Sequence, residues 1–197
     1  MSMPSSDTKS ELAPLDLSRF FESHPRLETE RLLLRQITIE DAEHVFAYGS
    51  DSETTKYMIF PTHRTIDDSL QWLQTLPGLY ERKERIAFAI TLKNGTFIGG
   101  CNFHNFRPQH HSAMLGYIMN RNYWGRGYMT EAVGELIRFG FAEMEMRRIS
   151  AHCDFENIRS ARVLERCGMK LEGVLEDYEL RRGVFVSTKS YAIIRGN

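Results

Sequence analysis

The segment Asn122-Tyr-Trp-Gly-Arg-Gly-Tyr-Met-Thr-Glu-Ala132 decides how the rest of this sequence is interpreted. It follows a run of β-prone residues, 113–119, and precedes apolar residues with helical spacing, so it is a loop between a strand and a helix. Gly125 and Gly127 allow a tight turn and a close approach of the backbone to a ligand. The first helical turn adds unpaired N–H groups and the positive end of the helix dipole. The loop therefore predicts a phosphate-binding site.

Loops with two glycines are not specific by themselves. Many are only tight turns, and dinucleotide-binding and P-loop folds also place glycines before a helix. In this sequence Thr130 stands where a dinucleotide fingerprint has its third glycine. The Gly-Lys-Ser/Thr triplet that binds a nucleotide phosphate with magnesium is also missing from the loop. Both nucleotide-binding classes are therefore disfavoured.

The composition is that of an ordinary folded domain. The 197 residues are 42% hydrophobic and 26% charged, which argues against a wholly disordered chain, collagen or a coiled coil. Lys and Arg (25) balance Asp and Glu (26), so the net charge of −1 gives no reason to expect nucleic acid or an anionic membrane as partner. Cys101, Cys153 and Cys167 are too far apart for a zinc ribbon, and the histidines are irregularly spaced, so no metal site is expected.

The sequence also predicts where the protein is located and where its folded domain begins and ends. No apolar run approaches the ~18 residues of a membrane-spanning helix, and the N-terminus lacks the pattern of a secretory signal, so we expect a cytoplasmic protein. Residues 1–25 are rich in Ser, Pro and charge and are predicted to be a flexible extension whose first ten residues are mobile. A single domain is expected over residues 26–197. The apolar residues of the extension that can dock on this domain are Leu12, Leu15, Leu17, Phe20 and Phe21.

The remaining sequence predicts strands and helices in alternation. The Asn-Gly turn at residues 94–95 predicts a hairpin, and Pro77-Gly78 predicts the end of a helix that begins after Thr65. The expected strands cover residues 31–36, 86–92, 96–103, 113–119, 148–153, 171–180 and 184–194. The expected helices cover residues 38–49, 65–77, 130 to about 141, and 157–167. This order predicts an α/β (α+β) fold around a mostly antiparallel sheet.

Three ordered segments resemble the GNAT N-acetyltransferases, most closely the RimJ/RimL-like branch that acetylates N-terminal amines of ribosomal proteins. Residues 27–35 (LETERLLLR) resemble the opening strand of that branch, residues 115–132 its central strand and loop, and residues 157–173 its Asn-x-x-Ser helix. The loop resembles the family's pyrophosphate pattern, Gln/Arg-x-x-Gly-x-Gly/Ala, from which Asn122 departs. The resemblance covers residues 26–194 and implies a mixed, largely antiparallel sheet, splayed at its centre and flanked by helices.

The resemblance also implies acetyl-CoA as co-substrate. Backbone N–H groups of the loop are expected to bind the pyrophosphate, those of the central strand the acetyl oxygen, and the Arg126 side chain a phosphate. Trp124 is expected to pack under the loop rather than line the acceptor cleft. The candidate cofactor-binding residues are Tyr117, Ile118, Met119, Asn122, Gly125, Arg126, Gly127, Tyr128, Met129, Thr130, Asn157 and Ser160.

Acetyl transfer to an amine needs a neutral amine, a polarised thioester carbonyl and a proton for the departing thiolate. Asn157 and Ser160 are three residues apart and share one face of a first helical turn. In the resembling branch this serine is the proposed proton donor to sulfur. Asn157 is equally well explained as the N-cap of the helix, and the two roles are compatible.

The base that takes the proton from the amine is the least defined group. Many relatives have a glutamate before Leu-Gly-Tyr, where this chain has Met114. The resemblance suggests Glu179 on the penultimate strand instead; the alternative is an ordinary solvated strand residue. The candidate catalytic residues are thus Ser160, Glu179 and Asn157. The fallback bases are His104, His110, His111 and His152.

The favoured function is transfer of an acetyl group from acetyl-CoA to a protein N-terminal α-amine, by direct attack in a ternary complex. The alternatives are acetylation of a small-molecule amine, such as an antibiotic, a polyamine or an amino acid, and a catalytically silent acyl-CoA-binding domain. Residues 40–80 and 105–112 are expected to select the acceptor. The protein is expected to be a monomer or a homodimer, because its terminal hairpin offers a sheet edge.

Overall fold

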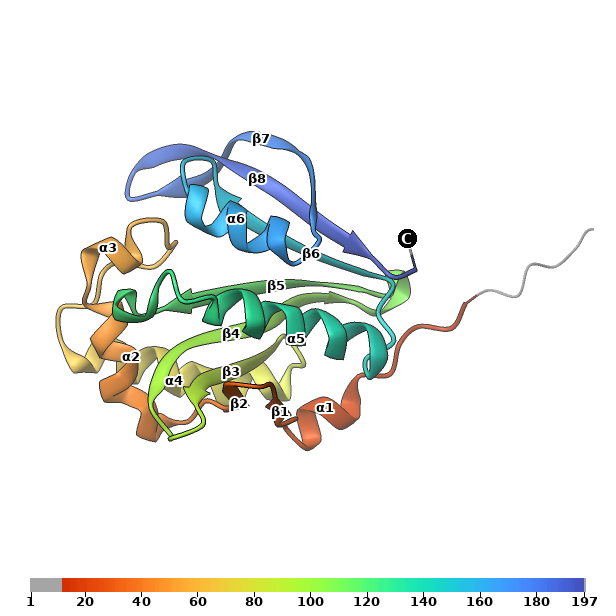
Figure 1. Ribbon diagram of the computed structural model, residues 1–197, viewed down its shortest axis with the longest axis horizontal. Helices are drawn as coiled ribbons and strands as arrows, with labels where there is room; N and C mark the ends of the chain where they lie inside the picture. Colours follow the sequence, from red (N-terminus) through yellow and green to blue (C-terminus); the bar gives the residue numbers. More distant parts are fainter. Residues whose placement is uncertain (1–11, 197) are drawn as a thin grey trace, which may run out of the picture.

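An eight-stranded sheet organises the computed structural model, which describes residues 12–196 (Figure 1). Its strand order is β1-β2-β3-β4-β5-β6-β8-β7, and β5–β6 is its parallel pair. The strands are β1 (Leu27–Glu28), β2 (Leu32–Gln36), β3 (Arg85–Leu92), β4 (Phe97–Arg107), β5 (Ser112–Met119), β6 (Arg148–Asp154), β7 (Lys170–Arg181) and β8 (Val184–Ile194). The predicted α/β (α+β) class and largely antiparallel sheet are confirmed.

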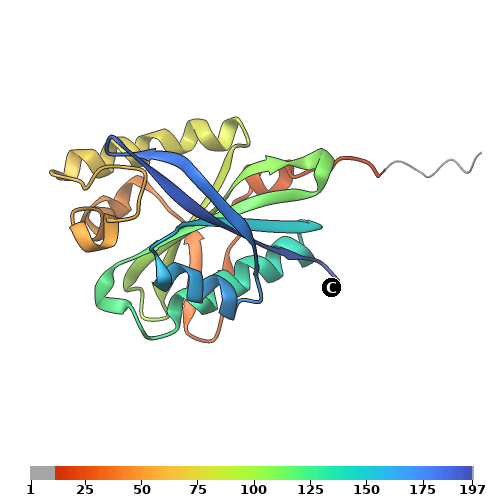
Figure 2. The ribbon, with the colours of Figure 1, turned by 90° about the horizontal axis from the view of Figure 1, so that it is seen from above.

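Helices cover both faces of this sheet, so that α4 lies on one side and α5 and α6 lie on the other (Figure 2). One apolar cluster joins α5 and α6 to β2, β3 and β4, and a second joins α2 and α4 to the opposite face of β3. The helices are α1 (Ser18–Glu22), α2 (Ala42–Gly49), α3 (Ser52–Thr55), α4 (Ile66–Glu81), α5 (Tyr128–Ala142) and α6 (Ile158–Arg166). None of the helices within residues 12–196 is long and apolar enough to cross a membrane.

The sheet splits between β5 and β6. These strands pair only over residues 112–114 and 148–150, and beyond Met114 they diverge (Figure 1). The N–H of Asn120 donates to Ile98 O on β4 at 2.9 Å. Since alternate residues of a strand direct their N–H groups to opposite sides, those of Tyr117 and Met119 face the gap. The N–H of Ile118, which was predicted as a donor with them, points to β4 instead.

Local signals in the sequence set the helix starts as predicted. Thr65 and Asp68 form a capping box at the start of α4, and the side chain of Asn157 accepts a hydrogen bond from Ser160 N at the start of α6. Gly168 follows α6 with a φ of +80°, a left-handed conformation that favours glycine. The Asn-Gly turn joins β3 to β4.

The predicted end of α4 at Pro77-Gly78 is wrong. Pro77 lies inside the helix, which continues to Glu81. A proline removes one helical hydrogen bond, at a cost of about 3 kcal/mol. Leu79 and Tyr80 pack against the same apolar cluster as the buried Leu73 and Leu76. Burial of this last turn therefore outweighs the local preference to stop.

The predicted flexible extension is also corrected for part of its length. Residues 18–22 form helix α1, with Leu17 and Phe20 buried in the core, and the Phe20 ring packs edge-on against Phe139 with centroids 5.3 Å apart. His24 reaches the sheet through a 2.9 Å hydrogen bond with Ala87 O. Residues 17–25 thus belong to the folded domain. The first ten residues, predicted to be mobile, lie outside the described part of the chain.

Candidate active site

Two cavities meet at the gap between β5 and β6. One, the large cavity, has a volume of about 910 Å³ and lies over the sheet face that α2 and α4 cover. The other, the loop groove, has a volume of about 710 Å³ and runs between the glycine loop and α6. The residues that line both are Tyr57, Met58, Tyr117, Ile118, Asn157 and Ser160. Two molecules, one in each cavity, would therefore meet beside Ser160.

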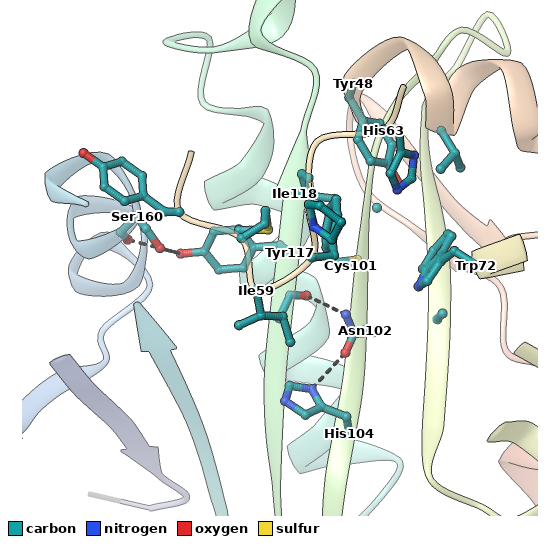
Figure 3. A pocket seen from close by; sticks show the side chains of 18 of the residues that line it. Tyr48, Ile59, His63, Trp72, Cys101, Asn102, His104, Tyr117, Ile118 and Ser160 are labelled. Carbon is teal, nitrogen blue, oxygen red and sulfur yellow. Dashed lines mark hydrogen bonds between the residues drawn. The ribbon is translucent and has the colours of Figure 1, made fainter. Parts of the chain in front are cut away.

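Two hydroxyl groups touch at this junction. Ser160 Oγ lies 2.7 Å from Tyr117 Oη, and the tyrosine hydroxyl also lies 3.1 Å from Ser160 O, to which it donates (Figure 3). Burial raises the pKa of Tyr117, so this hydroxyl stays protonated. Asn157 Oδ1 accepts from Ser160 N at 3.1 Å. The predicted N-cap role of Asn157 is confirmed.

The glycine loop forms one wall of the loop groove. Gly125 and Gly127 have φ angles of +75° and +79°, a left-handed conformation that other residues rarely adopt. A Cβ on Gly125 would meet nothing within 4 Å, so its backbone conformation rather than space requires a glycine there. Tyr128, Met129 and Thr130 continue the wall into α5. Ten of the twelve predicted cofactor-binding residues line this groove, and five of the ten come from the glycine loop and the first turn of α5.

Two predicted cofactor-binding residues do not line the groove. The N–H of Asn122 donates to Asn120 Oδ1 at 3.0 Å, in a turn beside the loop. The guanidinium of Arg126 lies 5.9 Å from the centre of the Tyr123 ring, at the exposed tip of the loop. Side-chain recognition by these two residues is therefore not built into this conformation.

Trp124 packs under the glycine loop, which was the favoured prediction. Its Nε1 donates to Met119 O at 2.8 Å, and its ring packs against the core and beneath the Arg159 guanidinium at 4.8 Å. The ring lines the loop groove and is absent from the large cavity as far as residues 12–196 define it. It ties the loop to the end of β5.

The large cavity is lined by three of the five side chains that were considered as bases. Glu179 lines it from β7, with Oε2 3.7 Å from Arg181 Nη2. His104 and His152 also line it, from β4 and β6, whereas His110 and His111 do not. Met114 faces His104 across the β4–β5 ladder. An imidazole therefore stands opposite the position where many relatives have a carboxylate.

The hydrogen bonds of His104 fix its tautomer. Asn102 Nδ2 donates to Gly116 O at 3.4 Å, which turns Asn102 Oδ1 toward His104 Nδ1 at 2.9 Å (Figure 3). Because a side-chain carbonyl oxygen only accepts, Nδ1 carries the proton and Nε2 is a hydrogen-bond acceptor. Burial, with the charges of Arg85 and His152, lowers the pKa of His104 to about 4. The ring is neutral at physiological pH.

Comparison with known proteins decides what this arrangement is. The model of the acetyltransferase (GNAT) domain matches residues 31–170. This chain belongs to the GNAT acetyltransferase family. It is 34% identical to the uncharacterized N-acetyltransferase YoaA of Bacillus subtilis, over 87% of this chain and 97% of that protein. It is 30% identical to the ribosomal protein uS5-alanine N-acetyltransferase of Escherichia coli, over 80% of this chain and 84% of that protein.

A solved structure of a GNAT acetyltransferase from Bacillus anthracis matches with a TM-score of 0.79 and 29% identity, over 88% of this chain and all of that one. The protein is an acetyl-CoA-dependent N-acetyltransferase, and its split sheet is the GNAT sheet. Both the fold and the enzyme class implied by the resemblance are confirmed.

Arg31 braces the glycine loop of this GNAT enzyme, a contact that the sequence did not reveal. Its Nε donates to Glu131 Oε2 at 2.6 Å, its Nη1 donates to Arg126 O at 3.1 Å, and its guanidinium lies 4.6 Å from the centre of the Tyr128 ring. Burial alone raises the pKa of Glu131, but hydrogen bonds from Thr29 and Arg31 outweigh it and hold the pKa below its ordinary value. The loop is thus fixed to the turn between β1 and β2.

A buried ion pair holds α6 in place. Arg181 Nη1 lies 2.5 Å from Asp154 Oδ2, and both side chains are less than 10% exposed. Asp154 Oδ1 also accepts from Glu156 N at 2.8 Å, and Asp154 O accepts from Asn157 N at 2.9 Å. The pair joins the end of β7, which carries Glu179, to the turn that begins the Ser160 helix.

Proposed function

We propose that this enzyme acetylates the α-amine of a protein N-terminus, with acetyl-CoA in the loop groove and the amine in the large cavity. The observation that carries the proposal is the junction of the two cavities at Tyr117 and Ser160. An amine and a thioester that meet there can react directly, without an acyl-enzyme. The uS5-alanine N-acetyltransferase relative supports the choice of an α-amine.

The residues at the junction have separate tasks in this reaction. Backbone N–H groups of Gly125 to Thr130 bind the pyrophosphate, and those of Tyr117 and Met119 stabilise the negative charge on the thioester oxygen. As the new C–N bond forms and the C–S bond breaks, the Ser160 hydroxyl gives its proton to the departing thiolate. Tyr117 Oη, 2.7 Å from Ser160 Oγ, orients this hydroxyl, and Ser160 takes up a proton from water after the thiol has left.

An α-amine suits this site better than a lysine. With a pKa near 8, about one tenth of an N-terminal amine is neutral at pH 7, whereas lysine, near 10.4, has fewer than about one neutral amine in a thousand. Glu179 is the proposed base, and the neutral His104 offers Nε2 as a hydrogen-bond acceptor. A weak base is sufficient for an amine that is already partly neutral.

A small-molecule amine is the second candidate acceptor. The volume of the large cavity, about 910 Å³, lies within the range of pockets that bind small ligands, ~300–1,000 Å³.

The release of free thiol from acetyl-CoA tests the proposed function. The purified enzyme is given a panel of N-terminal peptides with free or blocked α-amines, and a panel of small amines. Release with free peptides, lost when their α-amine is blocked, supports the proposal. Release only with small amines would contradict the peptide acceptor, and no release with either panel would support an acyl-CoA-binding domain without activity.

Glu179→Gln is expected to lower kcat/KM most strongly below pH 8 and progressively less at higher pH. The amine then loses its proton to solvent, and the base is no longer needed. The pH profile therefore becomes steeper on its alkaline side. Glu176→Gln, an exposed change on the same strand, is the control. A Glu179→Gln profile parallel to that of the unaltered enzyme would exclude Glu179 as the base.

Arg31→Met is expected to weaken coenzyme A binding about tenfold. It removes the contact to Arg126 O and leaves the Glu131 carboxylate without its counter-charge beside the phosphates. Glu131→Gln in the Arg31→Met protein should restore part of the affinity, because it removes the repulsion. Calorimetric titration with coenzyme A measures both effects, and Arg138→Met, which breaks the pair with Glu135 on the helix that carries Glu131, is the control. An unchanged Kd for Arg31→Met would contradict this role.

A further inference from the structure

Arg85 is a cation in the large cavity with no partner in the described chain. It begins β3, lies opposite His104 in the β3–β4 ladder and lines the cavity. Its side chain is partly buried, yet it makes no hydrogen bond and no ion pair with residues 12–196. Burial lowers the pKa of the Arg85 guanidinium, but arginine keeps its charge in proteins. A partly desolvated charge of this kind favours an anionic ligand.

The other charged groups that line this cavity have partners or lie in solvent, and Arg64 is the exposed one. Arg181 is paired with Asp154, and Asp68 accepts the backbone N–H groups of Arg64 and Thr65 at the start of α4. Glu179 lies across the sheet on β7 and is the carboxylate that is proposed to take a proton from the amine. The cavity therefore presents a negative group at one side and, at the other, the partly buried Arg85, which has no partner among residues 12–196.

We propose that the acceptor carries a carboxylate, which pairs with Arg85 while the amine reacts at Ser160. A planar guanidinium binds a carboxylate through two parallel hydrogen bonds, which gives both affinity and orientation. This inference deepens the proposed function and rests on it, because it names the acceptor of the same reaction.

The sheet geometry limits where the carboxylate is attached. Arg85 is two strands from β5, and its row in the ladders, through His104 and Met114, lies three residues from Tyr117. With strands ~4.8 Å apart and a rise of ~3.4 Å per residue, the Cα atoms of Arg85 and Tyr117 are about 14 Å apart. A separation of this size fits an acidic side chain in the first two residues of a peptide better than the α-carboxylate of a free amino acid, which is one carbon away from its amine.

Matched acceptors test this inference. The acceptors are two peptides that differ only in a second residue of Glu or Gln, and free alanine with alanine amide. We expect the enzyme to prefer the Glu peptide at least about tenfold in kcat/KM. Arg85→Gln should bring this ratio close to one, and Arg85→Lys should keep part of it. Arg82→Gln, an exposed change three residues away and outside the cavity, should keep the full ratio. An unchanged Kd for coenzyme A in Arg85→Gln shows that the fold is intact.

The outcomes separate this inference from the proposed function. Equal rates for the Glu and Gln peptides in the unaltered enzyme would overturn the role of Arg85 and leave the peptide acceptor standing. If only small amines release thiol, the peptide acceptor fails, and alanine against alanine amide tests Arg85. A preference for the carboxylate that Arg85→Gln abolishes supports the inference in either pair and identifies the source of the carboxylate. A preference that survives Arg85→Gln would overturn it.

Discussion

Ser160→Ala is expected to lower kcat by about 100-fold and to leave the affinity for acetyl-CoA nearly unchanged. General acid catalysis contributes ~10²–10⁴-fold to typical enzymatic rates, and the Ser160 hydroxyl is the proposed source of the proton for the thiolate. The substitution leaves the glycine loop and most other residues that line the loop groove unchanged. Steady-state thiol release gives kcat, and calorimetric titration gives the affinity.

Tyr117→Phe provides the internal comparison. It removes the partner of Ser160 Oγ and keeps the serine hydroxyl, so we expect a smaller loss of kcat than in Ser160→Ala. If the two hydroxyls act as one unit, the double variant should lose little more than Ser160→Ala alone. A Ser160→Ala enzyme that turns over at the unaltered rate would remove Ser160 from the mechanism.

Asp154→Ala is expected to lower the free energy of unfolding by about 3–5 kcal/mol. Breaking a buried ion pair from one side leaves the other charge buried without a partner, here Arg181. The substitution also leaves Glu156 N without its acceptor at the start of α6. Urea unfolding measures the loss of free energy. We expect kcat to fall as well, because the substitution loosens the start of the helix that carries Ser160.

Two further variants define the origin of this loss. Glu172→Ala breaks a more exposed pair with Arg148 and should cost less than about 1 kcal/mol. Replacing both partners of the buried pair, Asp154→Leu with Arg181→Met, should recover much of the stability, because no charge is left unpaired. A loss below about 1 kcal/mol in Asp154→Ala would show that the pair does not hold α6.

Features of the fold that depend on neighbouring residues were predictable. The capping box at the start of α4, the Asn-Gly hairpin and the left-handed Gly168 each involve a few consecutive residues, whose conformational preferences are strong. The same rules failed at Pro77 and at α1. There the buried contacts of Tyr80 and Phe20 with distant parts of the chain outweigh local preference.

The site was predictable where one segment supplies it. Asn157 and Ser160 share a helical turn, and Gly125 and Gly127 share a loop, so their spacing places them together. The hydrogen bond between the Tyr117 hydroxyl and Ser160 was not predicted. Strand alternation shows on which face of the sheet a side chain lies, but it does not show which residue that side chain contacts across the gap.

Contacts between strands could not be predicted from the sequence for a different reason. A β-bulge shifts the register between β3 and β4 at Ile90 and Thr91. A slip of one residue moves every side chain of a strand to the other face of the sheet. Counting residues from the hairpin turn therefore could not predict that Arg85 lies opposite His104. The contact of Arg31 with Glu131 joins residues 100 positions apart and leaves no local signal.

A crystal structure of the enzyme with coenzyme A tests the central claim most directly. We expect the pyrophosphate oxygens within hydrogen-bond distance of the backbone N–H groups between Gly125 and Thr130, and the sulfur in the gap beside Ser160. A nucleotide bound elsewhere, with the glycine loop unoccupied, would contradict the proposed site.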